Sequence, residues 1–255
     1  MMSQSACTAL VTGGAKRIGK AIVEDLAAHG FAVAIHCNRS RREAEALAEA
    51  IRSSGGRAAV LQADLTDPVA TGALVAEAAG ALGPVGLLVN SASIFEDDSV
   101  QDFDPAVADR HFAIHLTAPA ILARDFVQAL PADGQGLIVN IVDQRVWRLT
   151  PRYFSYTLSK SALWTATQTM AQALAPRIRV NAIGPGPTLP STRQDVKDFD
   201  AQVDGLILKR GPALPEFGAT IRYLWEARSV TGQMIALDGG QHLAWQTPDV
   251  TGMVE

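Results

Sequence analysis

The stretch Ala6-Cys-Thr-Ala-Leu-Val-Thr-Gly-Gly-Ala-Lys-Arg-Ile-Gly19 decides the fold of this chain. Its first half, residues 6–11, is short, apolar and partly β-branched, which predicts a buried strand. Residues 12–19 are rich in glycine and predict a tight turn, and the apolar spacing of residues 20–29 predicts a helix. A strand, a glycine-rich turn and a helix in this order can hold a pyrophosphate, because glycine lets the backbone come close and the helix N-terminus offers free N–H groups.

Strand and helix patterns alternate along the rest of the chain. Six further strands are predicted, at 31–35, 57–62, 85–89, 136–142, 178–183 and 234–237. Helices are predicted at 41–53, 68–82, 105–130 and 153–174, and Pro119 is placed to kink the third of them. Such alternation predicts an α/β fold, a doubly wound parallel sheet of about seven strands with helices on both faces. We expect a single Rossmann-type domain over residues 1–255.

Composition restricts the class of protein. The chain has 255 residues, a net charge of −4 and 48% hydrophobic residues, which fits one large domain whose core needs neither metal nor disulfide. Two cysteines, Cys7 and Cys37, are too few for a metal site, and we expect reduced thiols in a cytoplasmic protein. We expect no leader, membrane span or nucleic-acid partner, because the chain shows no long apolar run and no basic cluster.

Tyr156 and Lys160 lie four residues apart in a predicted helix, so they share one face of it. A lysine cation so close favours the phenolate, and we expect it to lower the tyrosine pKa toward neutrality, where the phenol can exchange protons. Asp143 follows the apolar run 136–142 and therefore lies at the end of a buried strand, where open α/β sheets place their active sites. The alternative is a chance pair on a solvated helix face.

Residues 12–19 match the pattern T-G-x-x-x-G-I-G, except that Arg17 replaces the middle glycine. The chain thus resembles the short-chain dehydrogenase/reductase family, and pteridine reductases, one of its branches, carry the same substitution. Arginine beside a pyrophosphate is chemically sensible, because it makes bidentate contacts to phosphate oxygens; the alternative is that Arg17 points into solvent. The resemblance implies a cofactor site formed by Gly13, Lys16, Arg17, Ile18, Gly19, Asn38, Arg39, Ser40, Asp64, Leu65, Asn90, Ser91, Ala92, Ser93, Tyr156, Lys160, Pro185 and Gly186.

The end of the second strand indicates which nicotinamide cofactor binds. NAD-binding members of this fold place a carboxylate there for the ribose hydroxyls, whereas this chain has His36-Cys-Asn-Arg-Ser-Arg-Arg42 and no acid before Glu43. Arg39 and Ser40 match residues of the pteridine reductases and would bind a 2′-phosphate, which predicts NADPH. Arg41 could join them or start a solvated helix, and we assign Arg42 to the helix start.

The proton-transfer set departs from the usual Asn, Ser, Tyr and Lys of the family. Asp143 stands in the serine position and His115 near the asparagine position, while Tyr156 and Lys160 match. A carboxylate suits a nitrogen-rich ring better than a ketone, because it cannot donate a hydrogen bond unless protonated. Pteridine reductases carry Asp at this position, and dihydromonapterin reductases look similar around His115. Phe95 matches their pterin-stacking aromatic, although core packing is the commoner role of a phenylalanine.

These observations predict an NADPH-dependent reductase of a pterin. Tyr156 would give the proton, Lys160 would hold the nicotinamide ribose, and Asp143 would orient the pterin or relay protons. Two alternatives stay open, a carbonyl or alcohol oxidoreductase that tolerates Asp143, and an inactive NADPH-binding regulator. His115 could equally be a packed or solvent-facing histidine.

Residues 186–212 interrupt the alternation of strands and helices and resemble the substrate loop of short-chain reductases, although residues 191–200 could instead be a disordered surface loop. The family commonly forms homotetramers, which is our expectation here. The segments 147–152 and 245–248 carry tryptophans that could border the pocket or serve subunit contacts.

Overall fold

A computed structural model describes residues 7–190, 195–247 and 251. It contains one parallel sheet with the strand order β3-β2-β1-β4-β5-β6-β7, so the predicted doubly wound sheet of seven strands is confirmed. The strands are β1 (Thr8–Thr12), β2 (Ala32–Cys37), β3 (Ala58–Gln62), β4 (Val85–Asn90), β5 (Gly136–Ile141), β6 (Ile178–Pro185) and β7 (Met234–Leu237). The strand order reverses between β1 and β4, and ligands of such sheets bind beyond the carboxyl ends of the strands at that point.

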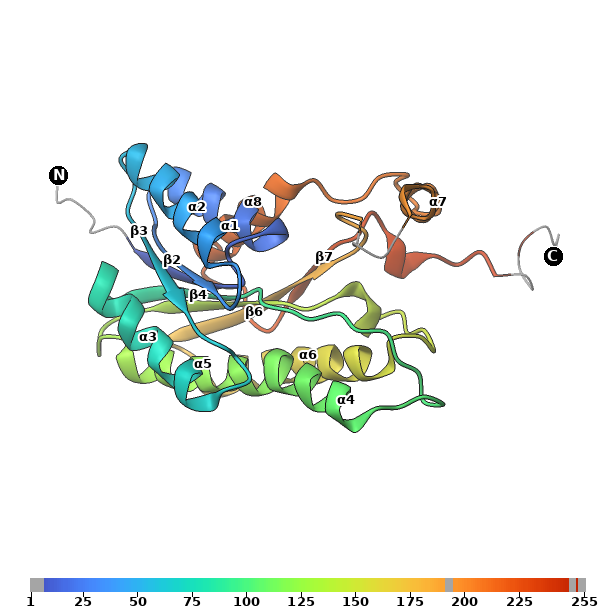
Figure 1. Cartoon of the computed structure of the whole chain (residues 1–255), viewed down its shortest axis with the longest axis horizontal. Coiled ribbons are helices and arrows are strands. Elements are labelled where there is room, and N and C mark those ends of the chain that lie inside the picture. The colour runs from blue at the N-terminus through green and yellow to red at the C-terminus, as the bar shows by residue number, and fades with distance from the viewer. Residues whose placement is uncertain (1–6, 191–194, 248–250, 252–255) are drawn as a thin grey trace.

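Helices cover both faces of the sheet (Figure 1). One face carries α1 (Arg17–Ala28), α2 (Arg41–Ser53) and α8 (Leu214–Glu226), and the other carries α3 (Pro68–Leu82), α4 (Pro105–Phe112), α5 (Ala118–Ala129) and α6 (Phe154–Leu174). A separate hydrophobic cluster fills the space between the sheet and each helical layer. The strands are therefore buried on both sides, which explains their continuous apolar runs.

The predicted helix over 105–130 is divided into three parts. A π-helical turn, Ala113–Thr117, separates α4 from α5 and has the buried His115 at its centre. Pro119 follows this turn and has no N–H to give to the carbonyl of residue 115, so a regular α-helical hydrogen bond cannot form there. Widened turns of this kind are frequent at functional sites.

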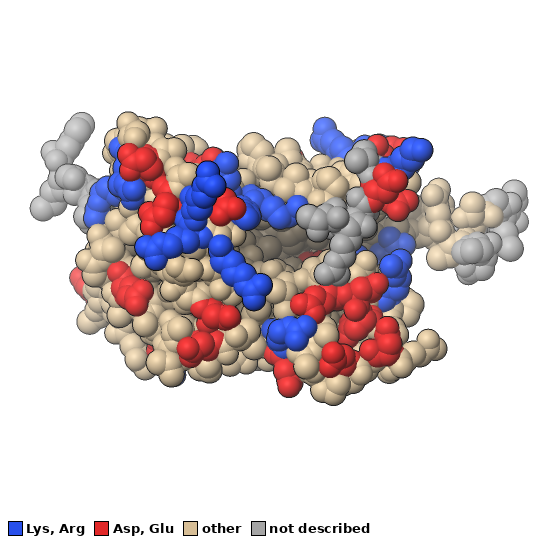
Figure 2. Space-filling view, viewed as in Figure 1, with Lys and Arg blue, Asp and Glu red and all other residues tan. Residues whose placement is uncertain are grey.

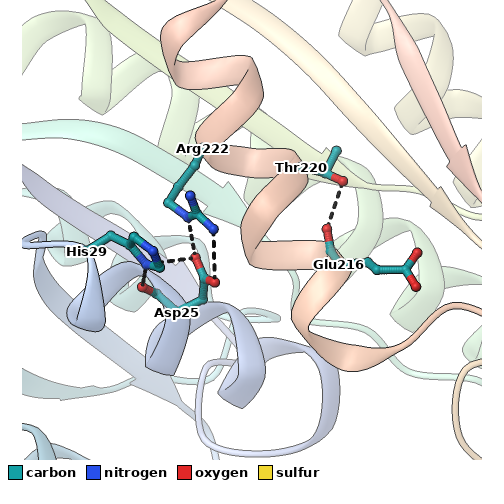
Figure 3. A network of polar contacts seen from close by, with 5 residues as sticks. All are labelled: Asp25, His29, Glu216, Thr220 and Arg222. Carbon is teal, nitrogen blue, oxygen red and sulfur yellow. Dashed lines mark hydrogen bonds and ion pairs between the residues drawn. The ribbon is translucent and has the colours of Figure 1, made fainter.

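Two helices were not predicted from the sequence. The first, α7 (Val196–Asp204), lies inside the expected irregular segment, so the interpretation of 191–200 as a disordered loop is wrong from residue 196 onward, and residues 191–194 lie outside the described part. The second, α8, packs against α1, and Arg222 on α8 donates to Asp25 on α1 at 2.7 Å (Figure 3). Gly218 permits this approach, because a Cβ there would lie 2.3 Å from the Asp25 Cβ.

Within the described residues, no helix combines the length and apolar character needed to cross a bilayer. The same residues contain no group of three or more His, Cys, Asp and Glu side chains arranged to hold a metal. Cys7 and Cys37 are both free thiols.

Candidate active site

A groove of about 230 Å³ lies beyond the carboxyl ends of β1, β2, β3 and β4. It is lined by the glycine-rich turn, the end of β2 and the segments that follow β3 and β4, including Gly13, Lys16, Asn38, Arg39, Ser40, Asp64, Leu65, Ala92 and Ser93. Figure 2 shows a hollow on this face of the molecule, with Lys and Arg side chains gathered on its α1 and α2 side. The structure thus brings half of the residues predicted to hold the cofactor together in one groove.

The glycine-rich turn is shaped by its own glycines and by a histidine. Gly13 has a φ of +64°, and a Cβ on it would lie 2.8 Å from the Ala92 backbone. Its N–H donates to His36 Nδ1 at 3.2 Å, while Nε2 of the same buried ring lies 3.1 Å from the carbonyl of Ala63. His36 therefore ties the turn to the ends of β2 and β3. The sequence reasoning missed this role, because a histidine inside an apolar strand has no local signature.

Arg17 has a φ of +53°, in the region that favours glycine, which is the residue expected at this place in the family pattern. Its guanidinium does not simply point into solvent, because it donates to the carbonyls of Leu189 and Pro190 at 3.2 and 3.1 Å. The turn that we expect to hold the pyrophosphate is thus joined to the segment after β6. In that segment Gly186, next to Pro185, donates to the Leu237 carbonyl at 2.9 Å.

The end of β2 carries no acidic side chain, as predicted. Arg39 is exposed at the groove, whereas Lys16 forms an ion pair with Glu43 at 2.7 Å. Arg41 contacts Gln62 at 3.2 Å and Glu45 at 3.4 Å, so its guanidinium has partners on β3 and α2. Arg39 lines the groove, and it remains our candidate for contact with a 2′-phosphate.

The segments after β3 and β4 form the next part of the groove wall. Hydrogen bonds from Thr66 to the Asp64 carboxylate hold the pKa of that group below its usual value. The hydroxyl oxygen of Thr12 accepts hydrogen bonds from the N–H groups of Ser91 and Ala92, at 3.0 and 3.1 Å, and so fixes the turn after Asn90. These positions agree with the cofactor wall that the resemblance implies.

Asp143, Tyr156 and Lys160 meet at the carboxyl end of β5, as the sequence predicted. The Tyr156 hydroxyl donates to Asp143 Oδ2 at 2.9 Å, and the N–H of Arg145 donates to Asp143 Oδ1 at 2.8 Å. Lys160 Nζ donates to the carbonyl of Ile141 at 2.8 Å and lies 5.8 Å from the centre of the Tyr156 ring. Tyr156 and Lys160 are both buried, so they are not a chance pair on a solvated helix face.

The expectation that Lys160 would lower the tyrosine pKa is wrong for this arrangement. Burial and the adjacent Asp143 carboxylate raise the pKa of Tyr156 well above its usual value, because both disfavour the phenolate. Burial also raises the pKa of Asp143, and burial lowers the pKa of Lys160 to about 8. The phenol thus keeps its proton at neutral pH, and Asp143 rather than Lys160 is the group that contacts it.

Phe95 lies beside these groups and is 38% exposed as a residue, which excludes a role in core packing. Its ring stacks on Tyr153 at 4.3 Å between centroids, with 25° between the planes, and meets Tyr156 edge-on at 4.7 Å. The guanidinium of Arg145 lies 5.4 Å from the Phe95 ring. This aromatic surface adjoins Asp143, and a flat ring system could stack there.

His115 is 1% exposed and lies edge-on to Tyr156 at 5.4 Å between ring centroids. Burial and the nearby Lys160 hold the pKa of His115 well below its usual value, so the ring is neutral. The structure therefore excludes a solvent-facing histidine. A second buried histidine, His111, stacks on it at 5.6 Å and was not singled out in the sequence.

Comparison with known proteins agrees with this architecture. The family described as short chain dehydrogenase matches residues 7–201. FolM alternative dihydrofolate reductase 1 from Brucella canis, solved in complex with NADP, is 65% identical, with a TM-score of 0.94 over 97% of this chain and 98% of that one. The Brucella suis protein of the same name, also with NADP, is 66% identical, with a TM-score of 0.95 over 97% and 99%. L-xylulose reductase from Bos taurus is 33% identical over 240 residues, 91% of this chain and 95% of the relative. The chain belongs to the short-chain dehydrogenase/reductase family.

Proposed function

We propose that this protein is an NADPH-dependent reductase that reduces a C=N bond of a pteridine ring. The observation that carries the proposal is the hydrogen bond between Tyr156 and Asp143, beside the exposed ring of Phe95. A carboxyl group in this position suits the ring nitrogens and amino group of a pterin, whereas a ketone oxygen needs a donor there. The FolM proteins of Brucella, whose name describes dihydrofolate reduction, share about two-thirds of their residues with this chain.

The cofactor assignment rests on the groove. Its glycine-rich turn lets a pyrophosphate approach the N-terminus of α1. Arg39 and Ser40 follow the end of β2, and no acidic residue precedes Glu43 there. Both Brucella structures hold NADP, which confirms the prediction of a phosphorylated nicotinamide cofactor. We assign the nicotinamide ribose contact to Lys160, as the family resemblance implies.

NADPH, when bound, supplies the hydride that is added to a carbon of the pterin ring. The chain supplies the proton for the adjacent nitrogen, and Tyr156 Oη carries it because the raised pKa of the phenol keeps it protonated. Asp143 accepts a hydrogen bond from the phenol and so holds in place the hydroxyl that gives up this proton. The same carboxyl group, whose pKa burial raises, can contact the pterin or relay the proton onward.

The test is the oxidation of NADPH with dihydromonapterin, dihydrobiopterin and dihydrofolate, compared with a panel of ketones. We expect turnover of at least one pterin, and a loss of about 10²–10⁴-fold in kcat for Tyr156→Phe, the range that a positioned proton donor contributes. Asp143→Ser should reduce pterin turnover sharply and leave or raise weak ketone turnover. Phe95→Ala should raise the pterin KM with little change in NADPH affinity.

Efficient reduction of ketones without any pterin turnover would overturn the proposal in favour of a carbonyl reductase. Binding of NADPH without oxidation of it by any substrate would favour the inactive regulator instead. Retention of most activity by Tyr156→Phe would assign the proton to another group.

We further infer a homotetramer in the cytoplasm, with residues 186–212 acting as the substrate loop. Support for the assembly comes from large apolar side chains on the surface, since Trp147, Leu243 and Trp245 are 43%, 61% and 62% exposed. Support for the loop comes from the contacts of Arg17 with Leu189 and Pro190, which join it to the cofactor turn. Light scattering after size-exclusion chromatography measures the number of subunits.

A further inference from the structure

The two buried histidines connect the segment that carries Phe95 to the helix that carries Tyr156. The N–H of Ile94 donates to His115 Nε2 at 3.3 Å, and the N–H of Glu96 donates to His111 Nε2, also at 3.3 Å. Phe95 stands between these two amides. The segment is therefore held on both sides of the aromatic ring that we expect to stack on the pterin.

The opposite nitrogen of each ring faces a serine of α6. His111 Nδ1 lies 2.7 Å from Ser155 Oγ, and His115 Nδ1 lies 2.8 Å from Ser159 Oγ. Ser155 and Ser159 are one helical turn apart, and Tyr156 lies between them in the sequence. The two histidines and the two serines are each at most 1% exposed. Each histidine thus connects a backbone amide of the Phe95 segment to a serine of α6, and the two connections run side by side.

The backbone partners define the tautomer of both rings. An amide N–H can only donate, so each Nε2 is an acceptor without a proton, and each Nδ1 carries the hydrogen and donates to its serine. Ser159 passes its own hydrogen on to the Tyr156 carbonyl at 2.7 Å. Both nitrogens of each ring are occupied, so neither ring is free to accept the proton of the Tyr156 hydroxyl.

We infer that His111 and His115 are positioning residues that hold Phe95 against Tyr156 and thereby set the affinity for the pterin. This inference rests on the proposed function for the identity of the substrate, whereas the contacts of the two histidines are independent of that function. A protonated ring would point an N–H at the Glu96 amide, so acidification should release the segment. The titratable and charged groups facing His111 are Asp98, Glu96, Arg110, Lys160, His115 and Tyr156, and Arg110 is already paired with Glu96.

The two nitrogens of His111 can be separated by substitution. The amide of asparagine reaches the position of Nδ1, and the amide oxygen of glutamine reaches the position of Nε2. His111→Asn therefore keeps the contact with Ser155 and loses the acceptor for Glu96, whereas His111→Gln keeps the acceptor and loses the serine contact. The two variants have similar size and polarity, and each serves as the control for the other.

The experiment measures pterin KM, kcat and NADPH affinity for the parent and both variants between pH 5.5 and 8. We expect His111→Asn to raise the pterin KM about five- to tenfold at pH 7, the loss of one buried hydrogen bond, with NADPH affinity unchanged. His111→Gln loses the Ser155 contact but keeps the acceptor for Glu96, so it should raise the pterin KM less than His111→Asn does, and it should remove the rise of KM at acidic pH. Equal KM values for the two variants, or an acid rise that persists in His111→Gln, would overturn the inference.

Hydrogen exchange of the Glu96 amide, followed by NMR, gives a readout that needs no substrate. We expect exchange to become faster in His111→Asn and to stay slow in His111→Gln, and equal exchange in both would overturn the inference. A parent enzyme that reduces no pterin would instead contradict the proposed function, and the amide exchange would still decide the role of His111. Thermal unfolding of each variant confirms that it is folded before these measurements.

Discussion

At the scale of single residues, the site departs from the family pattern at three positions, Arg17, His115 and Asp143. Asp143 stands where the family has a hydroxyl donor, and it accepts a hydrogen bond from the Tyr156 hydroxyl at 2.9 Å. Arg17 occupies a left-handed backbone position and uses its guanidinium to reach the segment after β6. Both ring nitrogens of His115 form positioning contacts, one with the Ile94 amide and one with Ser159. The departures thus have defined structural partners.

Arg39 provides the residue-scale prediction on cofactor choice. Arg39→Asp should narrow or invert the preference for NADPH over NADH, because a charge-assisted contact of about 1.5–3 kcal/mol is replaced by repulsion of the 2′-phosphate. Dissociation constants for both cofactors, from quenching of tryptophan fluorescence, measure the effect. Arg42→Asp makes the same charge change on the exposed start of α2 and should leave the preference nearly unchanged. Similar results for the two variants would remove Arg39 from the phosphate site.

At the scale of elements, close approaches between helices and turns support the site. The π-helical turn at Ala113–Thr117 brings His115 to the active site, and His36 joins β2 to the glycine-rich turn. Helix α8 packs against α1 through the close approach at Gly218 and the ion pair between Asp25 and Arg222 (Figure 3). These contacts are at Asp25, so they hold the C-terminal half of α1, the helix whose N-terminus we expect to face the pyrophosphate.

Gly218 and Gly80 provide the prediction at this scale. Gly218→Ala should destabilise the protein by about 1–3 kcal/mol, because its new methyl group would overlap the Asp25 side chain and separate α8 from α1. Gly80 lies in α3 with nothing within 4 Å of a Cβ, so Gly80→Ala should stabilise by about 0.5–1 kcal/mol. Urea denaturation gives both free energies of unfolding. If Gly218→Ala were as stable as Gly80→Ala, separating α1 from α8 would not lower the free energy of unfolding.

At the scale of the whole molecule, the fold buries titratable groups beyond those that react. His36, His111 and His115 are each at most 1% exposed, and burial lowers the pKa of all three below 6.5. Burial raises the pKa of Asp143 in the same site. The parallel sheet explains this concentration, because its strands end together at an edge covered by segments from both helical layers.

These histidines make stability depend on pH. Below pH 6.5 these histidines bind protons in the unfolded chain but not in the folded protein. The free energy of unfolding should therefore rise as the pH increases toward 6.5. Each histidine can contribute a slope of up to about 1.4 kcal/mol per pH unit. Asp143 acts in the opposite direction above pH 3.8, because the folded protein retains its proton. Urea midpoints between pH 5 and 7 measure the slope.

The control for this prediction is the double variant His111→Gln/His115→Gln, which removes two of the titrating rings. Its slope between pH 5 and 6.5 should be smaller than that of the parent, even where its stability is lower at every pH. An unchanged slope would mean that the two rings titrate alike in the folded and unfolded states.

The sequence by itself determined the sheet, the cofactor edge and the meeting of Asp143 with Tyr156 and Lys160, because alternating periodicity and strand-ending residues are local signals that a parallel sheet gathers at one edge. Only the tertiary structure decided which group accepts the hydrogen bond of the Tyr156 hydroxyl. The sequence placed Lys160 against the phenol, and the fold places Asp143 there and turns Lys160 toward the Ile141 carbonyl. Likewise His111 and Ser155 are 44 residues apart, and no pattern connects them. Burial and the direction of a side chain depend on packing between distant elements, which local spacing does not encode.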